Sequence, residues 1–97
     1  MYVDYYEKLE KAFQGLWLDF MEFTRKHEFV VSYWGISHSP WSNGERAIKI
    51  IASYLNTEVW DEIMSMIEKN GLVTRHWFIT AKNKEIRILI WLALKEV

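Results

Sequence analysis

The sequence lacks cysteine altogether and contains a single proline among its 97 residues. Without cysteine the chain has no disulfide framework, thiolate nucleophile or cysteine-ligated zinc. Its acidic, mixed beginning lacks the basic and apolar regions of a secretory signal, and no apolar run approaches the length of a membrane span. We therefore expect a cytoplasmic protein that does not cross a membrane.

The chain also lacks an excess of charge of one sign, because 12 lysines and arginines offset 13 aspartates and glutamates. This balance gives no overall basic field for nucleic-acid binding, so such a role requires a local patch. The proportions of apolar and charged residues, 51% and 26%, are those of a globular protein. We expect one domain over residues 1–97. The shortage of cysteine and glutamine, with abundant isoleucine, lysine and glutamate, suggests a thermophilic source.

The hydrophobic pattern predicts two helices and three strands directly. A helix is also expected to begin at a capping residue and to end at a glycine that adopts a left-handed conformation. The predicted elements are a helix from Asp4 to His27, a strand from Phe29 to Ile36, a helix capped by Asn56 or Thr57 and ended by Asn70-Gly71, and strands from Leu72 to Thr80 and from Lys84 to Leu94 around the turn Ala81-Lys82-Asn83.

The segment from Glu45 to Tyr54 has two interpretations. Ile48, Ile50 and Ala52 alternate as in a strand, whereas Ala47, Ile48 and Ile51 also satisfy helical spacing. We predict a strand, because the segment follows another strand across a loop that contains turn-forming residues.

An internal repeat supports the strand interpretation. A shift of 43 positions superposes six identical pairs between residues 16–37 and 59–80, which are Trp17/Trp60, Met21/Met64, Lys26/Lys69, Val30/Val73, Trp34/Trp77 and Ile36/Ile79. Beyond the loop a shift of 40 pairs Ile48 with Ile88 and Ile50 with Ile90. The repeat predicts two helix–strand–strand units, approximately 4–55 and 56–97, in an α+β fold of order αββαββ. Two such units would form a four-stranded antiparallel sheet with both helices on one face.

Alternation along the strands predicts two faces of the sheet. The face beneath the helices is expected to be apolar and to contain Val30, Trp34, Ile36, Ile48, Ile50, Val73, Trp77, Ile79, Ile88 and Ile90. The other face mixes aromatic residues with cations and contains Val31, Tyr33, Lys49, Ile51, Thr74, His76, Phe78, Arg87, Leu89 and Trp91. An uncovered patch of this size usually marks a contact surface.

This second face gives two functional hypotheses. The candidate binding residues are Tyr33, Trp41, Lys49, His76, Phe78, Arg87 and Trp91. We expect a non-enzymatic binding module that buries the face against its copy in a homodimer, which the near-neutral charge favours. In the alternative, the aromatic rings stack the bases of a single-stranded nucleic acid while the cations approach its phosphates. Trp41 either folds back over the sheet or acts as a contact anchor.

The sequence specifies no reaction. Its three histidines, at positions 27, 38 and 76, have no partner at metal-ligand spacing. No serine lies in a Gly-x-Ser-x-Gly turn, and no glycine-rich phosphate loop is present. Glu58, Asp61 and Glu62 are explained by the first turn of a helix, where the dipole favours carboxylates. We therefore expect no catalytic residue, metal or cofactor.

The order helix–hairpin–helix–hairpin resembles the core of the LAGLIDADG homing endonucleases, which use such a sheet against DNA. That family carries an acidic metal ligand near the end of each equivalent helix, whereas here Glu28 stands opposite Gly71. The resemblance concerns topology, and it implies no nuclease activity. A looser resemblance links the chain to secretion-chaperone-like α/β dimers, and no motif accompanies it.

Overall fold

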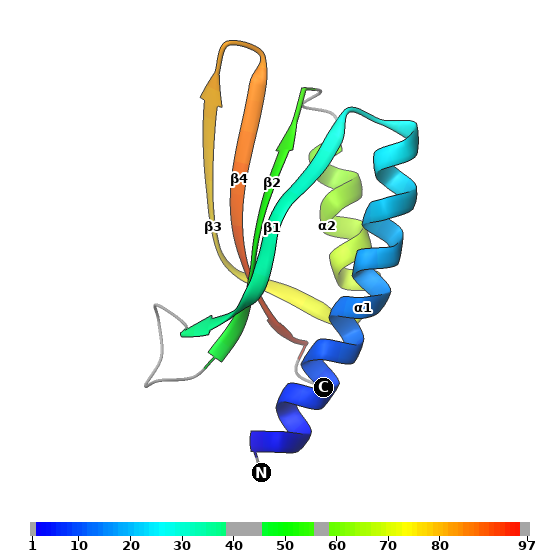
Figure 1. Ribbon diagram of the computed structural model, residues 1–97, viewed down its shortest axis with the longest axis vertical. Coiled ribbons are helices and arrows are strands. Elements are labelled where there is room, and N and C mark those ends of the chain that lie inside the picture. The colour runs from blue at the N-terminus through cyan, green and yellow to red at the C-terminus, as the bar shows by residue number, and fades with distance from the viewer. Residues whose placement is uncertain (1, 39–45, 56–58, 96–97) are drawn as a thin grey trace.

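The computed structural model describes residues 2–38, 46–55 and 59–95, and it confirms the αββαββ order (Figure 1). Its elements are α1 (Tyr2–Lys26), β1 (Phe29–His38), β2 (Arg46–Tyr54), α2 (Val59–Lys69), β3 (Leu72–Lys82) and β4 (Glu85–Leu94). The ambiguous second segment is thus a strand. The turn between β3 and β4 is shorter than predicted and consists of Asn83 and Lys84, because Lys82 already pairs with Glu85. The expected caps Asn56 and Thr57, and the loop residue Trp41, lie outside the described residues.

The four strands form one antiparallel sheet, as predicted, and their order is β1-β2-β4-β3. Ile50 pairs with Ile90 at its centre, and the register runs evenly to either side, with Ile48 opposite Leu92 and Ala52 opposite Ile88. Because Ile50 and Ile90 are also matched by the sequence repeat, this register is the one produced by a twofold axis between β2 and β4.

Each edge strand contains one irregularity. The β1–β2 register shifts between Val31 and Tyr33, and the β3–β4 register shifts between Thr74 and His76. The extra residues, Ser32 and Arg75, are separated by the same 43 positions as the repeat. A bulge of this kind reverses the alternation of side chains along its strand.

These bulges correct four of the predicted face assignments. Val30 and Val73 pair with Ser53 and Ala93 on the face away from the core. Val31 and Thr74 instead lie on the core face, opposite Ala52 and Leu92. Alternation resumes after each bulge with the phase that the sequence predicted, so the assignments from Tyr33 and His76 onward are correct.

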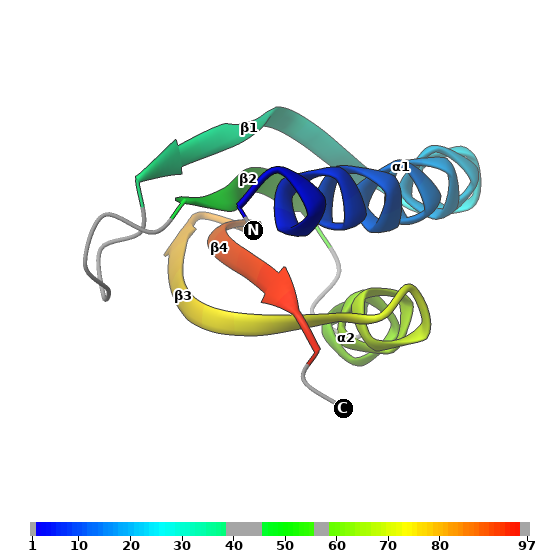
Figure 2. The same cartoon turned by 90° about the horizontal axis from the view of Figure 1, so that it is seen from below.

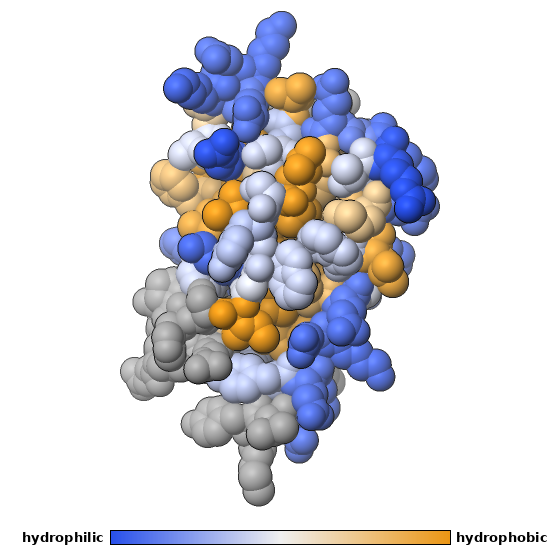
Figure 3. All heavy atoms as spheres, in the orientation of Figure 1, coloured by the Kyte–Doolittle hydropathy of each residue, from blue (hydrophilic) through white to orange (hydrophobic). Residues whose placement is uncertain are grey.

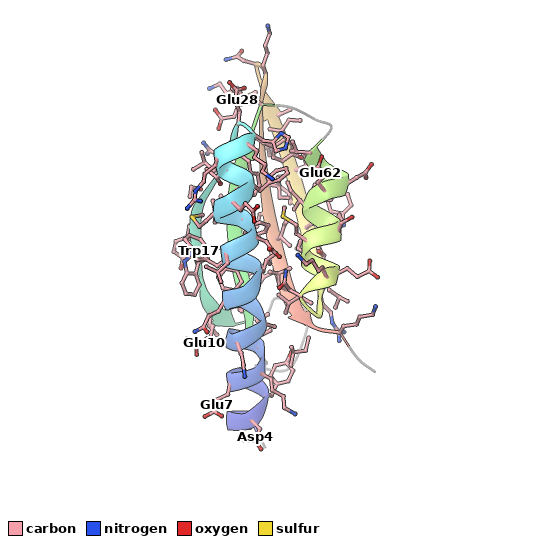
Figure 4. All side chains as sticks on the ribbon, turned by 90° about the vertical axis from the view of Figure 1, so that its right-hand side faces the viewer. Asp4, Glu7, Glu10, Trp17, Glu28 and Glu62 are labelled. Atoms are coloured by element: carbon pink, nitrogen blue, oxygen red, sulfur yellow. The ribbon has the colours of Figure 1, made fainter. Side chains whose placement is uncertain are left out.

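Both helices pack on the same face of the sheet. Trp34, Ile50, Ile90 and Trp77 form one row across the four strands, so their side chains share a face. The Trp34 ring lies 4.7 Å from Phe13 of α1, and the Trp77 ring lies 5.5 Å from Trp60 of α2, measured between centroids. Figures 2 and 4 show α1 and α2 side by side against this face.

The hydrophobic core lies between the helices and this face. The periodic apolar residues of α1 meet Ile63 and Ile67 of α2 over the isoleucines of β2 and β4, and the largest of these side chains are fully buried. Each such side chain contributes about 1.5–3 kcal/mol of transfer free energy. No helix in the described part of the chain is long and apolar enough to span a membrane.

Polar contacts fix the end of α2 against α1. Gly71 has a φ of 77°, and its N–H donates to the carbonyl oxygen of Glu68, as expected for a glycine that ends a helix. The neighbouring Asn70 side chain donates through Nδ2 to Asp19 Oδ2 and to the Met66 carbonyl oxygen, both at 2.8 Å. A Cβ at Gly15 would lie 2.6 Å from Asn70 Oδ1, so Gly15 permits this close approach.

Candidate binding surface on the outer face of the sheet

The face of the sheet turned away from α1 and α2, here called the outer face, aligns most of the predicted binding residues. Strand pairing gives three rows that span all four strands on this face, which are Gly35–Lys49–Trp91–His76, Tyr33–Ile51–Leu89–Phe78 and Val30–Ser53–Arg87–Thr80. Six of the seven candidate residues therefore share one surface. The seventh, Trp41, lies outside the described residues.

Two aromatic rings stand at opposite ends of the middle row. Tyr33 on β1 is 52% exposed and Phe78 on β3 is 58% exposed. Three interstrand spacings separate their strands, or about 14 Å. A Cβ at Gly35 would lie 3.2 Å from the Tyr33 hydroxyl oxygen, so the tyrosine ring extends along the sheet over this glycine. The outer face thus presents an aromatic ring at each edge.

Trp91 belongs to the same face but differs in exposure. Its side chain is only 8% exposed, so it does not offer a free ring face to a ligand. Lys49 Nζ lies 5.7 Å from the centroid of the Trp91 ring, within the range of a cation–π interaction. The indole therefore stabilises the position of the Lys49 ammonium group. In the described part of the outer face, the exposed residues with rings are Tyr33, His76 and Phe78.

The cations of the outer face continue toward the β3–β4 turn. Lys82 and Arg87 lie on this face with Glu85, whose Oε1 is 3.5 Å from Arg87 Nη2. Both side chains of this ion pair are largely exposed, so the pair is weak and easily exchanged. Together with Thr80 and Asn83 these residues line a cleft of about 370 Å³.

Charge is divided between the two layers of the molecule. The four strands and the β3–β4 turn contain one carboxylate, Glu85, against six cations, which are Arg46, Lys49, Arg75, Lys82, Lys84 and Arg87. The two helices contain five cations against eight carboxylates, which are Asp4, Glu7, Glu10, Asp19, Glu22, Asp61, Glu62 and Glu68. Figure 4 shows several of these acidic residues on the helical side. The near-zero net charge therefore conceals a basic sheet and an acidic helical layer.

A second polar cluster lies in a cleft of about 340 Å³ between the two helices. His27 Nε2 is 3.9 Å from Glu62 Oε2, and Lys69 Nζ is 3.6 Å from Asp19 Oδ1. These pairs join α1 and the residue that follows it, His27, to α2, and they account for these charged groups structurally. Within residues 2–38, 46–55 and 59–95, no group of histidines and carboxylates is arranged to hold a metal ion.

Sequence reasoning missed the charged layers, although their signal was present. Counting charges separately for the predicted strands and helices reveals the same division that the structure displays, whereas the net charge cancels it. No protein-family model, curated protein or solved structure matches the chain.

Proposed function

We propose that the protein is a non-enzymatic module that binds single-stranded nucleic acid on the outer face of its sheet. The observation that carries this proposal is the presence of exposed rings and an excess of cations on one surface. Stacking of a base on an aromatic side chain contributes about 1–3 kcal/mol, and lysine and arginine add the attraction to phosphates.

The arrangement favours a single strand over a duplex. Bases can stack on Tyr33 and Phe78 only when their faces are accessible, and a duplex hides those faces between neighbouring base pairs. Lys49 lies in the row on one side of the middle row, and Arg87 and Lys82 lie in the rows on its other side, toward the β3–β4 turn. A strand that crosses the sheet would place its bases on the rings and its phosphates near these cations.

The competing function is dimerisation, in which the outer face packs against the same face of a second copy. The near-neutral net charge of the chain favours this alternative. The division of charge weakens that argument, because a face-to-face dimer would bring two surfaces with an excess of cations together, each containing Lys49, Lys82 and Arg87. In the described part of the outer face only Glu85 could compensate them. We therefore rank nucleic-acid binding first.

Fluorescence anisotropy with a labelled oligothymidylate of roughly ten nucleotides, within the site sizes of known single-strand binders, tests the proposal. Each of the variants Tyr33→Ala and Phe78→Ala is expected to weaken binding roughly 5- to 150-fold, which corresponds to the loss of one stacked base. The matched control is Ile79→Ala, which changes the residue next to Phe78 on the opposite face and should leave binding unchanged.

Two outcomes would overturn the proposal. One is a wild-type protein that does not bind the oligonucleotide at low salt, and the other is a folded Phe78→Ala variant with full affinity. A wild-type protein that fails to bind, but whose dimer dissociates in Phe78→Ala, would instead support the face-to-face dimer. Far-ultraviolet circular dichroism verifies that each variant is folded.

A further inference from the structure

The outer edge of β1 is the most unusual surface of the molecule beyond the outer face. β1 is an edge strand, since it pairs with β2 on one side only. Its ten residues, Phe29–His38, contain no lysine, arginine, aspartate, glutamate or proline. Edge strands normally carry such residues, because an unprotected row of backbone donors and acceptors invites another strand.

Exposed apolar side chains flank this edge on both sides of the sheet. Val30 and Tyr33 lie on the outer face, and Trp34 and Ile36 lie on the helical face. Figure 3, in the orientation of Figure 1, shows apolar and pale side chains across the middle of this view with hydrophilic ones above and to the right. An apolar centre with a polar rim is typical of an interface.

The opposite edge of the sheet provides a natural comparison. β3 is matched to β1 by the sequence repeat and carries a bulge at the equivalent position. It nevertheless contains two cations, Arg75 and Lys82, whereas β1 contains no lysine or arginine. In an antiparallel pair of identical strands, like charges approach one another and destabilise the pairing. Since both edges carry the bulge, the difference between them is charge: Arg75 and Lys82 oppose self-pairing at β3, and β1 contains neither lysine nor arginine.

We propose that β1 pairs with β1 of a second copy, in a twofold-symmetric dimer whose two sheets form one continuous antiparallel sheet. The occupant is a second copy because an uncharged strand is compatible with itself, and a closed twofold interface uses the same surface on both subunits. The natural centre is Gly35, where the absence of a side chain lets two backbones approach. Trp34 then lies opposite the partner subunit's Ile36 on the helical side, an aromatic–β-branched pair that stabilises sheets.

This dimer differs from the face-to-face dimer because it leaves the outer face free, and it does not depend on nucleic-acid binding. Sedimentation velocity of the full chain is expected to show a dimer at micromolar concentrations. The variant Ile36→Lys places a charge on the β1 edge and should weaken dimerisation at least tenfold. The matched control is Ile79→Lys, because Ile79 is the repeat partner of Ile36 and the two are 38% and 39% exposed.

A second readout uses the absence of native cysteine. With a short bis-maleimide, the variant Ile36→Cys is expected to give a cross-linked dimer, because Ile36 and the partner subunit's Ile36 are diagonal neighbours beside the Gly35 centre, whereas Ile79→Cys at the equivalent position of β3 is not. Val30→Lys provides an independent disruption if Ile36→Lys fails to fold. A wild-type monomer at 100-fold higher concentration, or equal loss of the dimer in Ile36→Lys and Ile79→Lys, would overturn the proposal. Cross-linking of Ile79→Cys alone would place the interface at β3 and also overturn it.

Discussion

The salt dependence of oligonucleotide binding gives the sharpest quantitative test of the outer face. For single strands, the logarithm of the affinity falls with the logarithm of the salt concentration by about 0.7 for each phosphate that a cation neutralises. Three cations, Lys49, Lys82 and Arg87, lie on the outer face in the described part of the chain. The wild-type slope should therefore be about −2.

The variant Lys49→Met removes one of these charges and retains a long apolar side chain over Trp91. The salt dependence is expected to become weaker, with a slope of roughly −1.4, and the folded structure should be unchanged. Glu85→Gln acts in the opposite direction, because it releases Arg87 from the carboxylate that lies 3.5 Å away. Since exposed ion pairs are worth about 0.2–1 kcal/mol, this variant should bind roughly 1.4- to 5-fold more tightly.

The assay is an anisotropy titration of labelled oligothymidylate at four salt concentrations, with wild type, Lys49→Met and Glu85→Gln measured in parallel. Lys11→Met on the acidic helical layer is the matched control and should keep the wild-type slope. Binding whose slope is the same in wild type and Lys49→Met would refute the assignment of phosphate contacts to the outer face.

Two further predictions concern stability. Gly71→Ala should cost about 1–2 kcal/mol in urea unfolding, because the φ of 77° strains a residue with a Cβ while no neighbouring atom obstructs it; an unchanged midpoint would contradict the left-handed geometry. Burial raises the pKa of the Tyr54 phenol above its ordinary value, so the neutral form is favoured in the folded state. The stability that the buried neutral phenol contributes is complete below pH 10 and is lost above it, because the phenol of the unfolded chain ionises first. The free energy of unfolding of Tyr54→Phe should therefore decrease less than that of wild type between pH 9 and 11. Identical decreases would exclude a contribution of Tyr54 to the pH dependence.

The elements and the sheet could be predicted because the repeat and the hydrophobic period agree. The repeat resolved Arg46–Tyr54 as a strand, since its counterpart β4 alternates clearly. The bulges could not be predicted, because neither Ser32 nor Arg75 is a glycine or a residue that marks a break in pairing. Their effect was limited to the residues that precede them, which explains why Val30 and Val73 were assigned wrongly and Trp34 and Trp77 correctly.

The residues that make up the outer face could be predicted from the repeat and the strand alternation. The exposure of each side chain on that face could not. Tyr33, Lys49 and Phe78 follow from alternation and from the pairing of strands. The burial of Trp91 depends on how neighbouring side chains cover an indole, and a period of two contains no such information. The pairing of Arg87 with Glu85 follows from their spacing on one strand, but its exposure emerges only from the folded chain.

The separation of acidic helices from a basic sheet gives the molecule an electric dipole moment out of proportion to its small net charge. In the field of a polyanion, such a dipole experiences a torque that turns the sheet toward the polyanion before the two surfaces touch. Encounters would then begin in the productive orientation and the association rate would rise, an advantage that vanishes as added salt shortens the reach of the field.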